Sequence, residues 1–447
     1  MQREVLFADG HELTARRGLM WRRSPLLTRL VGIVVLLTCA CGNRSGAAQL
    51  TFSGATPPVG GGYRVALVRA DGTPIEGVAP KFVTTSAGEQ TLTLRLDSPA
   101  LYRDNKALVR VAVDALANEN DPVPLGHGST LLEVRKREVA QATVTLAPPP
   151  NLPEAAASMR YTSLPDGHGV VVDAPSLEGF ALVAWGERAD GRLSKLTVMS
   201  NSPETIELAD ERLVDRKDFN LLITGEVVAD PSVLRQPVGW PLYRGNLPEA
   251  MRPHLQAALG SNGSFDRLFD SIGAAENHAR LATGSSQVAG QRRHSEHVYN
   301  ILRAAADAAD LNDDGDAQRP SISHSESAET VRQAAIDNMV AAVEAVPELP
   351  LAAQRSDRLS EADACAVTLR EAINDAAAEE LGTALVKAKY AADSDTADQD
   401  SETQALHDAI EKLRGAPFSS PPDEPQTARC FLERAEAATV VPLQALP

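Results

Sequence analysis

The chain has 447 residues, of which 43% are hydrophobic and 4% aromatic, and its formal net charge at pH 7 is −17. Such an acidic chain is not drawn to nucleic-acid phosphates or anionic lipid headgroups by its net charge, so we expect no nucleic-acid partner. The length allows two or three domains, whose cores must rely on Val, Leu, Ile and Ala because aromatic residues are scarce.

An export signal is predicted near the front of the chain. Residues 22–43 read RRSPLLTRLVGIVVLLTCACGN, in which arginines precede an apolar run and small residues precede a cysteine. This order is typical of a secretory signal peptide. The apolar run from Leu30 to Leu37 is much shorter than the roughly 20 residues of a membrane-spanning helix. We therefore expect a signal peptide over residues 1–40 and a flexible tether over residues 41–60.

The end of this signal resembles the lipobox of bacterial lipoproteins, because Leu37-Thr38-Cys39-Ala40-Cys41 places a small residue before a cysteine. The resemblance implies lipidation of Cys41, cleavage after Ala40 and attachment to the membrane through the lipid. It places the protein in the bacterial cell envelope. Gly42, standing where an inner-membrane retention signal would have Asp, favours the outer membrane. Cys39 is the competing lipidation site.

Two features of the N-terminal residues bear on the mature chain. Met20 is an alternative start to Met1, because the residues before it include acidic side chains that are unusual in a signal. Removal of residues 1–40 takes away six arginines and three acidic residues, which leaves a net charge of about −20.

The remaining cysteines, Cys365 and Cys430, predict a disulfide, because an exported chain meets oxidising conditions. The alternative is two separate buried thiols. The sequence contains neither a CxxC metal-ligand pair nor the CxxCH motif of c-type haem attachment.

Two β regions are predicted after the tether. Short segments alternate apolar and polar residues, as in QTLTLRLD at residues 90–97, and are separated by Gly, Pro, Asn and Asp. This pattern predicts an antiparallel β-sandwich-like domain over residues 61–147. Three prolines at residues 148–150 mark a boundary, and a second β region is expected over residues 151–246.

A helical domain is predicted over residues 247–447, where Ala, Glu, Leu, Arg and Asp predominate. Helices are expected over residues 248–259, 265–282, 291–309, 328–345, 360–392, 402–414 and 426–438. The predicted fold class is multidomain α+β, with N-terminal antiparallel β-sandwich-like modules followed by a C-terminal all-α helical domain.

One candidate site is the acidic segment ADLNDDGDAQ at residues 309–318, which resembles the first half of an EF-hand or dockerin-type calcium loop. Alternate oxygens in a tight loop can surround a hard cation, and Gly315 permits the turn. The expected ligands are Asp310, Asn312, Asp314 and, through its backbone carbonyl, Asp316. The twelfth position is Ser321, so Glu326 or Glu329 would have to substitute for the usual glutamate. The alternative is a polar connector between helices, with a capping aspartate.

A second candidate site consists of histidines. His294 and His297 are three residues apart and share a helix face, while His278 lies on the preceding predicted helix. An antiparallel helix pair would bring the three together, with Glu276 or Glu296 nearby, as ligands of zinc, copper or iron. The alternative is three surface or half-buried histidines beside a polar connector.

The two candidate sites together resemble a pattern in uncharacterised bacterial lipoproteins, where a helix reading like HAEHVxN precedes a loop rich in Asp, Asn and Gly. The corresponding residues here are HSEHVYN at 294–300 and DLNDDGD at 310–316. The resemblance spans about 45 residues, from Glu276 to Gln318. It implies a shared helical module and no known activity.

No catalytic motif is present among GxSxG, HExxH, the P-loop and GxGxxG before a helix. We therefore expect a lipid-anchored cell-envelope protein with a non-enzymatic binding or structural role, whose helical domain binds a protein or surface ligand and contains a calcium-stabilised loop. The alternative is a metal- or haem-binding helical domain in metal handling or redox. A third hypothesis, an unrecognised hydrolase, requires a deep polar pocket between domains.

Overall fold

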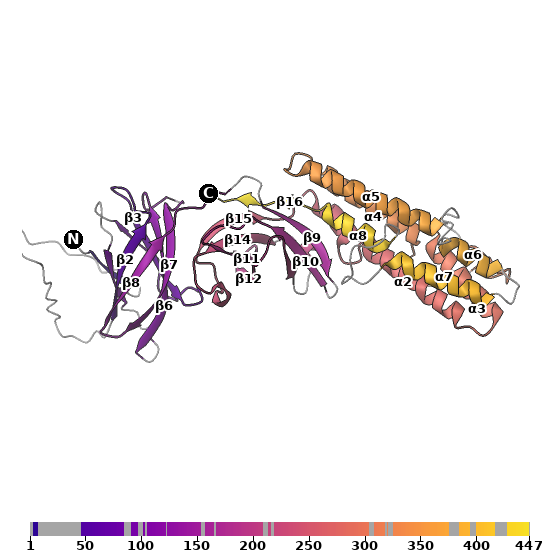
Figure 1. Cartoon of the computed structure of the whole chain (residues 1–447), viewed down its shortest axis with the longest axis horizontal. Coiled ribbons are helices and arrows are strands. Elements are labelled where there is room, and N and C mark those ends of the chain that lie inside the picture. The colour runs from indigo at the N-terminus through magenta and orange to yellow at the C-terminus, as the bar shows by residue number, and fades with distance from the viewer. Residues whose placement is uncertain are drawn as a thin grey trace, which may run out of the picture.

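The protein consists of two β regions and a helical region arranged in an extended row (Figure 1). This computed structural model describes residues 3–7, 46–84, 91–96, 102, 105–121, 123–152, 157–164, 167–208, 213–215, 219–303, 308–317, 320, 325–374, 384–393, 399–415 and 427–446. The predicted multidomain α+β class is confirmed. Most of the predicted signal peptide and the predicted lipidation site Cys41 lie outside the described residues.

The first β region is a sandwich of two sheets, with strand orders β1-β5-β2-β8 and β4-β3-β6-β7. Its strands are β1 (Arg3–Phe7), β2 (Gly46–Gly54), β3 (Gly62–Arg69), β4 (Lys81–Thr84), β5 (Thr91–Leu96), β6 (Lys106–Leu116), β7 (Gly126–Arg135) and β8 (Val139–Leu146). The pairing is antiparallel except that β1 runs parallel to β5 and β2 runs parallel to β8. Apolar side chains from both sheets fill the space between them.

The predicted tether over residues 41–60 needs correction, because residues 46–54 form strand β2 between two other strands. Ala48, Leu50 and Phe52 alternate with polar residues and are buried in the sandwich core. The small and polar residues around them gave the segment the composition of a linker, while the short period-two pattern within it is that of a half-buried strand.

The second β region is also a sandwich, with strand orders β13-β10-β9-β16 and β12-β11-β14-β15-β17. Its strands are β9 (Ser158–Leu164), β10 (Gly167–Asp173), β11 (Ala181–Glu187), β12 (Leu193–Val198), β13 (Glu204–Leu208), β14 (Asn220–Glu226), β15 (Trp240–Gly245), β16 (Val441–Pro442) and β17 (Gln444–Ala445), with 3-10 turns η2 (Leu213–Asp215) and η3 (Pro231–Val233). The last two strands come from the C-terminal end of the chain, which returns from the helices to pair with β9 and β15.

This return corrects the predicted extent of the helical domain, residues 247–447, since the helical region is an insertion within the second sandwich. Strands of two residues carry no detectable periodicity, and their partners lie far away in the sequence. Leu443 shows why the segment docks: its side chain is buried in the core that the sandwich shares with the helices.

The helical region packs its helices side by side (Figure 1). They are α1 (Arg252–Leu259), α2 (Ser264–Thr283), α3 (Val288–Leu302), α4 (Ala328–Glu344), α5 (Ala352–Asn374), α6 (Ala384–Asp393), α7 (Gln399–Arg414) and α8 (Ala428–Ala437). The helix predicted over residues 360–392 overlaps both α5 and α6, and residues 375–383 between them lie outside the described residues. None of the described helices combines the length and the apolar character needed to cross a membrane.

The early start of α5 depends on a tertiary contact. The Arg355 side chain is completely buried, and its guanidinium donates hydrogen bonds to backbone carbonyls that include Val346, Leu349 and Val440. These acceptors satisfy a buried charge that would otherwise be costly, and they hold the first turn of α5 against the C-terminal segment.

Cys365 on α5 and Cys430 on α8 form the predicted disulfide pair, with Sγ atoms 2.27 Å and Cα atoms 6.1 Å apart. Both side chains lie in the apolar core. A crosslink between residues 65 positions apart stabilises a fold mainly by restricting the unfolded chain. The crosslink joins α5 to α8, the helix that precedes strands β16 and β17 of the second sandwich.

The two sandwiches meet at a partly buried histidine, His127, whose side chain is 13% exposed. His127 on β7 lies with Nδ1 2.6 Å from Asp114 Oδ1, and its other ring nitrogen contacts the carbonyl oxygen of Val238, just before β15. Burial lowers the pKa of His127, but the bond to Asp114, the charge of Asp114, the Val238 carbonyl and the charge of Glu226 outweigh this and raise the pKa above its ordinary value. Glu226 is itself buried and accepts a hydrogen bond from the Val238 backbone N–H at 3.2 Å.

We expect the contact between the sandwiches to weaken with rising pH. A histidine with a higher pKa in the folded than in the unfolded chain stabilises the fold when protonated. This contribution is complete below the unfolded-state value of about 6.5 and is lost as the pH rises through the folded-state value. His127→Gln removes the charge-assisted bond, so it should lower the free energy of unfolding by about 1.5–3 kcal/mol in acid and abolish this pH dependence. Denaturant unfolding at several pH values measures both effects.

The control for this measurement is His254→Gln, a change on α1 that leaves the junction intact. It should retain the pH dependence of the unmodified chain. Equal pH dependence in the His127→Gln variant and the unmodified chain would contradict the assignment of the junction as the titrating contact.

Candidate metal centre

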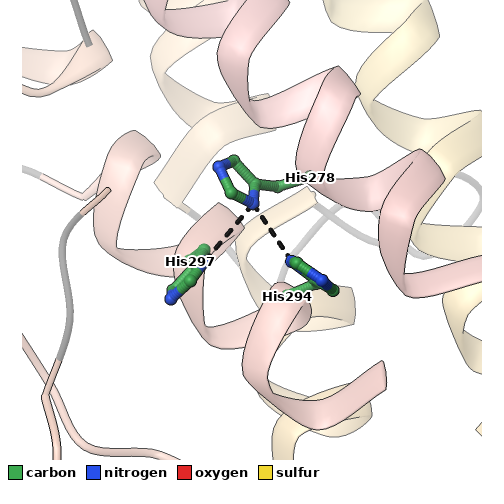
Figure 2. A group of neighbouring side chains, drawn as sticks. All are labelled: His278, His294 and His297. Atoms are coloured by element: carbon green, nitrogen blue, oxygen red, sulfur yellow. Dashed lines mark hydrogen bonds between the residues drawn. The ribbon is translucent and has the colours of Figure 1, made fainter. Parts of the chain in front are cut away.

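Three histidines from two adjacent helices converge in the helical region (Figure 2). His278 comes from α2, and His294 and His297 come from α3. The Nδ1 atom of His278 lies 3.2 Å from Nδ1 of His294 and 3.3 Å from Nδ1 of His297. One ligand atom from each ring can be chosen so that all three lie within 4.8 Å of one another. The sequence-predicted convergence of these three histidines is therefore observed.

The local sequence explains why the helices place these rings together. Gly284 ends α2, and a short turn leads into α3 at Val288, so the two helices form an antiparallel pair. Helical spacing puts His294 and His297 one above the other on the face of α3 that meets α2. Small residues of α2, such as Ala275 and Ala279, are fully buried, which permits close packing against neighbouring helices.

The surroundings of His278 and His294 favour the neutral imidazole. Burial and, to a smaller extent, the charges of His297 and His294 when protonated together lower the pKa of His278 to about 4. Burial also lowers the pKa of His294, as does the positive charge of Arg293. A neutral imidazole has a free nitrogen lone pair, and this is the form that binds metal ions. His297 is only 7% exposed, whereas the other two are half-buried, so the cluster opens toward solvent on one side.

The spacing of the nitrogen atoms matches that of metal ligands. In a tetrahedral zinc site with Zn–N bonds of about 2.0–2.1 Å, two ligand nitrogens are separated by about 3.3–3.4 Å. The two separations from His278 have nearly this value. Three protein ligands would leave one position for water or a further ligand. Among the described residues, this is the one group of three His, Cys, Asp or Glu side chains that could hold a metal ion.

The two glutamates expected near the histidines have other partners. Glu276 lies 3.3 Å from the guanidinium of Arg414 on α7. Glu296 is only 1% exposed, and its Oε2 atom accepts hydrogen bonds from the backbone N–H groups of Leu311 at 2.9 Å and Asn312 at 3.2 Å. Glu296 thus binds the start of the acidic loop.

The acidic loop has the tight conformation that its sequence predicts. The side-chain oxygens of Asp310, Asn312 and Asp314 each accept a backbone N–H from within the loop, at 3.0, 2.9 and 2.9 Å. Gly315 has φ of +84°, which favours glycine. The remaining predicted ligand, Asp316, donates its own N–H to Asp314. The Asp310 Oδ1 atom is buried and has no hydrogen-bond partner among the described residues.

The twelfth position of the expected calcium loop is not filled by either substitute glutamate. Glu326 accepts a hydrogen bond from Arg267, and Glu329 pairs with Arg332 at 2.9 Å. Ser321 lies outside the described residues. The structure therefore supplies the first half of the pattern without a bidentate carboxylate at its end.

Asn300 is a second anchor that the sequence analysis missed. Its side chain donates to the Ala309 carbonyl at 2.9 Å and accepts from the Ala309 N–H at 2.8 Å. Glu296 and Asn300 are four residues apart, so they share one face of α3, beside the face that carries the histidines. This explains the HSEHVYN segment: its histidines meet α2, while its glutamate and asparagine hold the loop. The i,i+4 spacing of Glu296 and Asn300 was the sequence feature that could have predicted their shared role.

Comparison with protein-family models, curated proteins and solved structures found no match to this chain.

We expect Glu296→Ala to release the acidic loop. The change leaves the N–H groups of Leu311 and Asn312 without their acceptor, so it should cost about 1–3 kcal/mol of stability. Hydrogen exchange should show faster exchange of these two amides. Glu276→Ala is the matched control, because it removes only a contact to the exposed Arg414. Unchanged exchange in the Glu296 variant would contradict the anchoring role.

Proposed function

We propose that the helical region binds one divalent transition-metal ion through His278, His294 and His297. The supporting observation is the convergence of their Nδ1 atoms at 3.2 and 3.3 Å, close to the ligand spacing of a tetrahedral zinc site. Imidazole also suits copper, iron and nickel, and copper(II) binds such ligands more tightly than zinc. A zinc-class ion held by three neutral imidazoles, with an open fourth position, is the form of the site that we propose.

An open position suits a role in metal handling. An ion with a free coordination position can exchange ligands with water, a small molecule or another protein, whereas a closed four-ligand site mainly stabilises a fold. The partly exposed side chains of His278 and His294 provide the route by which an ion enters and leaves. We propose no catalytic residue, and the binding role of the helical region is non-enzymatic.

Metal binding should depend on each histidine. The full chain, purified without a histidine tag and incubated with zinc, should bind about one equivalent by elemental analysis, and His294→Ala should weaken binding at least tenfold. Protons compete with the ion for imidazole, so affinity should fall in acid. The pKa of His278, about 4, predicts that this ligand stays deprotonated in mildly acidic solution.

His407→Ala on α7 is the matched control, since it removes a histidine outside the cluster. It should bind zinc like the unmodified chain. Absence of zinc, copper, nickel and iron after incubation with each ion would refute the proposal, as would equal binding by the His294 and His407 variants.

Calcium in the acidic loop is a second proposal. The observation that favours it is the buried Asp310 Oδ1 atom without a hydrogen-bond partner, beside carboxylate and amide oxygens already oriented by the loop. The missing twelfth ligand implies weak binding and a structural role. The same elemental analysis reports calcium, which should be lost on Asp314→Ala and retained in the His294 variant. Retention of calcium by the Asp314 variant would place the ion elsewhere.

We further propose that the site is presented in the bacterial cell envelope, attached to the outer membrane by a lipid on Cys41. The support is the sequence of residues 22–43, with its arginines, short apolar run and terminal cysteine. The two sandwiches then act as a spacer or adhesive surface between the lipid and the helical region, which remains free to meet a protein or surface ligand.

Cys41→Ala should move the protein from the membrane fraction to the soluble fraction, because a protein without its acyl chains loses the apolar anchor. Fractionation followed by immunodetection measures this. Cys39→Ala is the matched control and should leave the protein in the membrane fraction. The opposite pattern would assign the lipid to Cys39, and membrane attachment of both variants would contradict lipid anchoring.

A further inference from the structure

A polar cavity lies where the second sandwich meets the helical region. Its volume is about 510 Å³, within the range of small-molecule sites, and its wall combines β9 and β10 with α5 and α8. The charged and polar residues that matter are Arg160, Ser163, Arg358, Arg429, Arg434 and Glu436. In Figure 1, β9 and β10 lie at the end of the helical region that is remote from α3, so this cavity is separate from the histidine cluster.

Four arginines line the cavity, and three of them have acidic partners. Arg358 and Arg434 both contact Glu361, at 3.0 and 2.9 Å. Arg429 pairs with Glu433 at 2.7 Å on the same helix. These pairs hold the guanidinium groups in place along α5 and α8.

Arg160 on β9 differs from the other three. No described residue forms a hydrogen bond or an ion pair with its guanidinium, although the more distant charges of Glu436 and Glu433 act on it. Burial lowers the pKa of Arg160, but an arginine remains charged at physiological pH. Partial burial of a cation without a direct partner costs free energy, and a bound anion would offset this cost.

Glu436 is not a direct partner of Arg160, because its carboxyl group bonds to Ser163 instead. Its side chain is buried, and one oxygen accepts hydrogen bonds from the backbone N–H of Ser163 at 2.8 Å and from the Ser163 hydroxyl. Burial outweighs the opposing effects of the Ser163 bonds and the charge of Arg160, so the pKa of Glu436 is raised to about 7. The four arginines outnumber the three carboxyl groups beside them, those of Glu361, Glu433 and Glu436, so the cavity keeps an excess of positive charge.

We propose that this cavity binds a small molecule through an oxyanion group, with Arg160 as the first contact and Arg358 as the second. The planar guanidinium offers two parallel N–H donors that match the oxygens of phosphate, sulfate or carboxylate. The recessed position and the net charge of −17 on the chain oppose polyanions such as nucleic acid or an anionic membrane surface. A ligand of this class would bridge β9 and α5, and so the sandwich and the helices.

The test is calorimetric titration of the full chain with sulfate, inorganic phosphate and succinate, at constant ionic strength in a zwitterionic buffer. We expect saturable one-to-one binding of at least one probe, with a thermal unfolding midpoint that rises with its concentration. Arg160→Gln should weaken this binding at least tenfold. Arg358→Gln, on a different element and half-exposed, should also weaken it and keeps the test valid if the first variant fails to fold.

Arg192→Gln is the matched control, because Arg192 belongs to the same sandwich but its side chain is 80% exposed beside Asp190. It should bind the probe like the unmodified chain. Binding of phosphate and sulfate without succinate would identify a tetrahedral oxyanion, and the reverse a carboxylate; either supports the proposal. Absence of binding for all three probes at about 10 mM would overturn it, as would equal affinity in all folded variants.

Discussion

The buried carboxylate of Glu296 is the contact on which the geometry of both candidate metal sites depends. It accepts two backbone N–H groups from the acidic loop, while the neighbouring His297 faces α2. A carboxyl group that is only 1% exposed is tolerated when such donors satisfy its oxygens. The same helix carries His294 and His297, so the loop that the glutamate holds lies beside the histidine cluster. One helix thus orients a nitrogen-rich site and an oxygen-rich site on adjacent faces.

The C-terminal segment imposes the second constraint. Leu443 and Val441 are buried in the core shared by the second sandwich and the helices, and Arg355 donates to the Val440 carbonyl. The helical region is therefore joined to the sandwich both where the chain enters it, after β15, and where the chain leaves it, at β16. The disulfide links α5 to α8, the helix that leads back to β16. The cavity around Arg160 exists because of this closure: β9, α5 and α8 meet only after the chain has returned.

Sequence periodicity predicted those structural elements that depend on contacts between residues close together in the sequence. Alternating strands, amphipathic helices and the paired helices that carry His278 and His294 were all predictable, because a short turn fixes which residues of two helices lie at the same height. The return of β16 was not, since its partner β9 lies far away in the sequence, and the linker-like composition of residues 46–54 concealed the alternation of strand β2. The cavity was equally invisible, because Arg160 and Arg358 are brought together only by packing.

The junction between the second sandwich and the helices differs physically from the junction between the two sandwiches. The second sandwich and the helices share one continuous apolar core, so the histidine cluster and the arginine-lined cavity belong to a unit that resists relative motion. The first sandwich meets that unit through Val68, which packs against the apolar cluster around Trp185, and through the Asp71 carbonyl, which accepts the backbone N–H groups of Arg235 and Gln236. It also meets the unit through His127, whose charge depends on pH. Loss of this charge weakens only the outer junction. Both candidate sites lie outside this junction, so loss of the His127 charge leaves the contacts that form them in place.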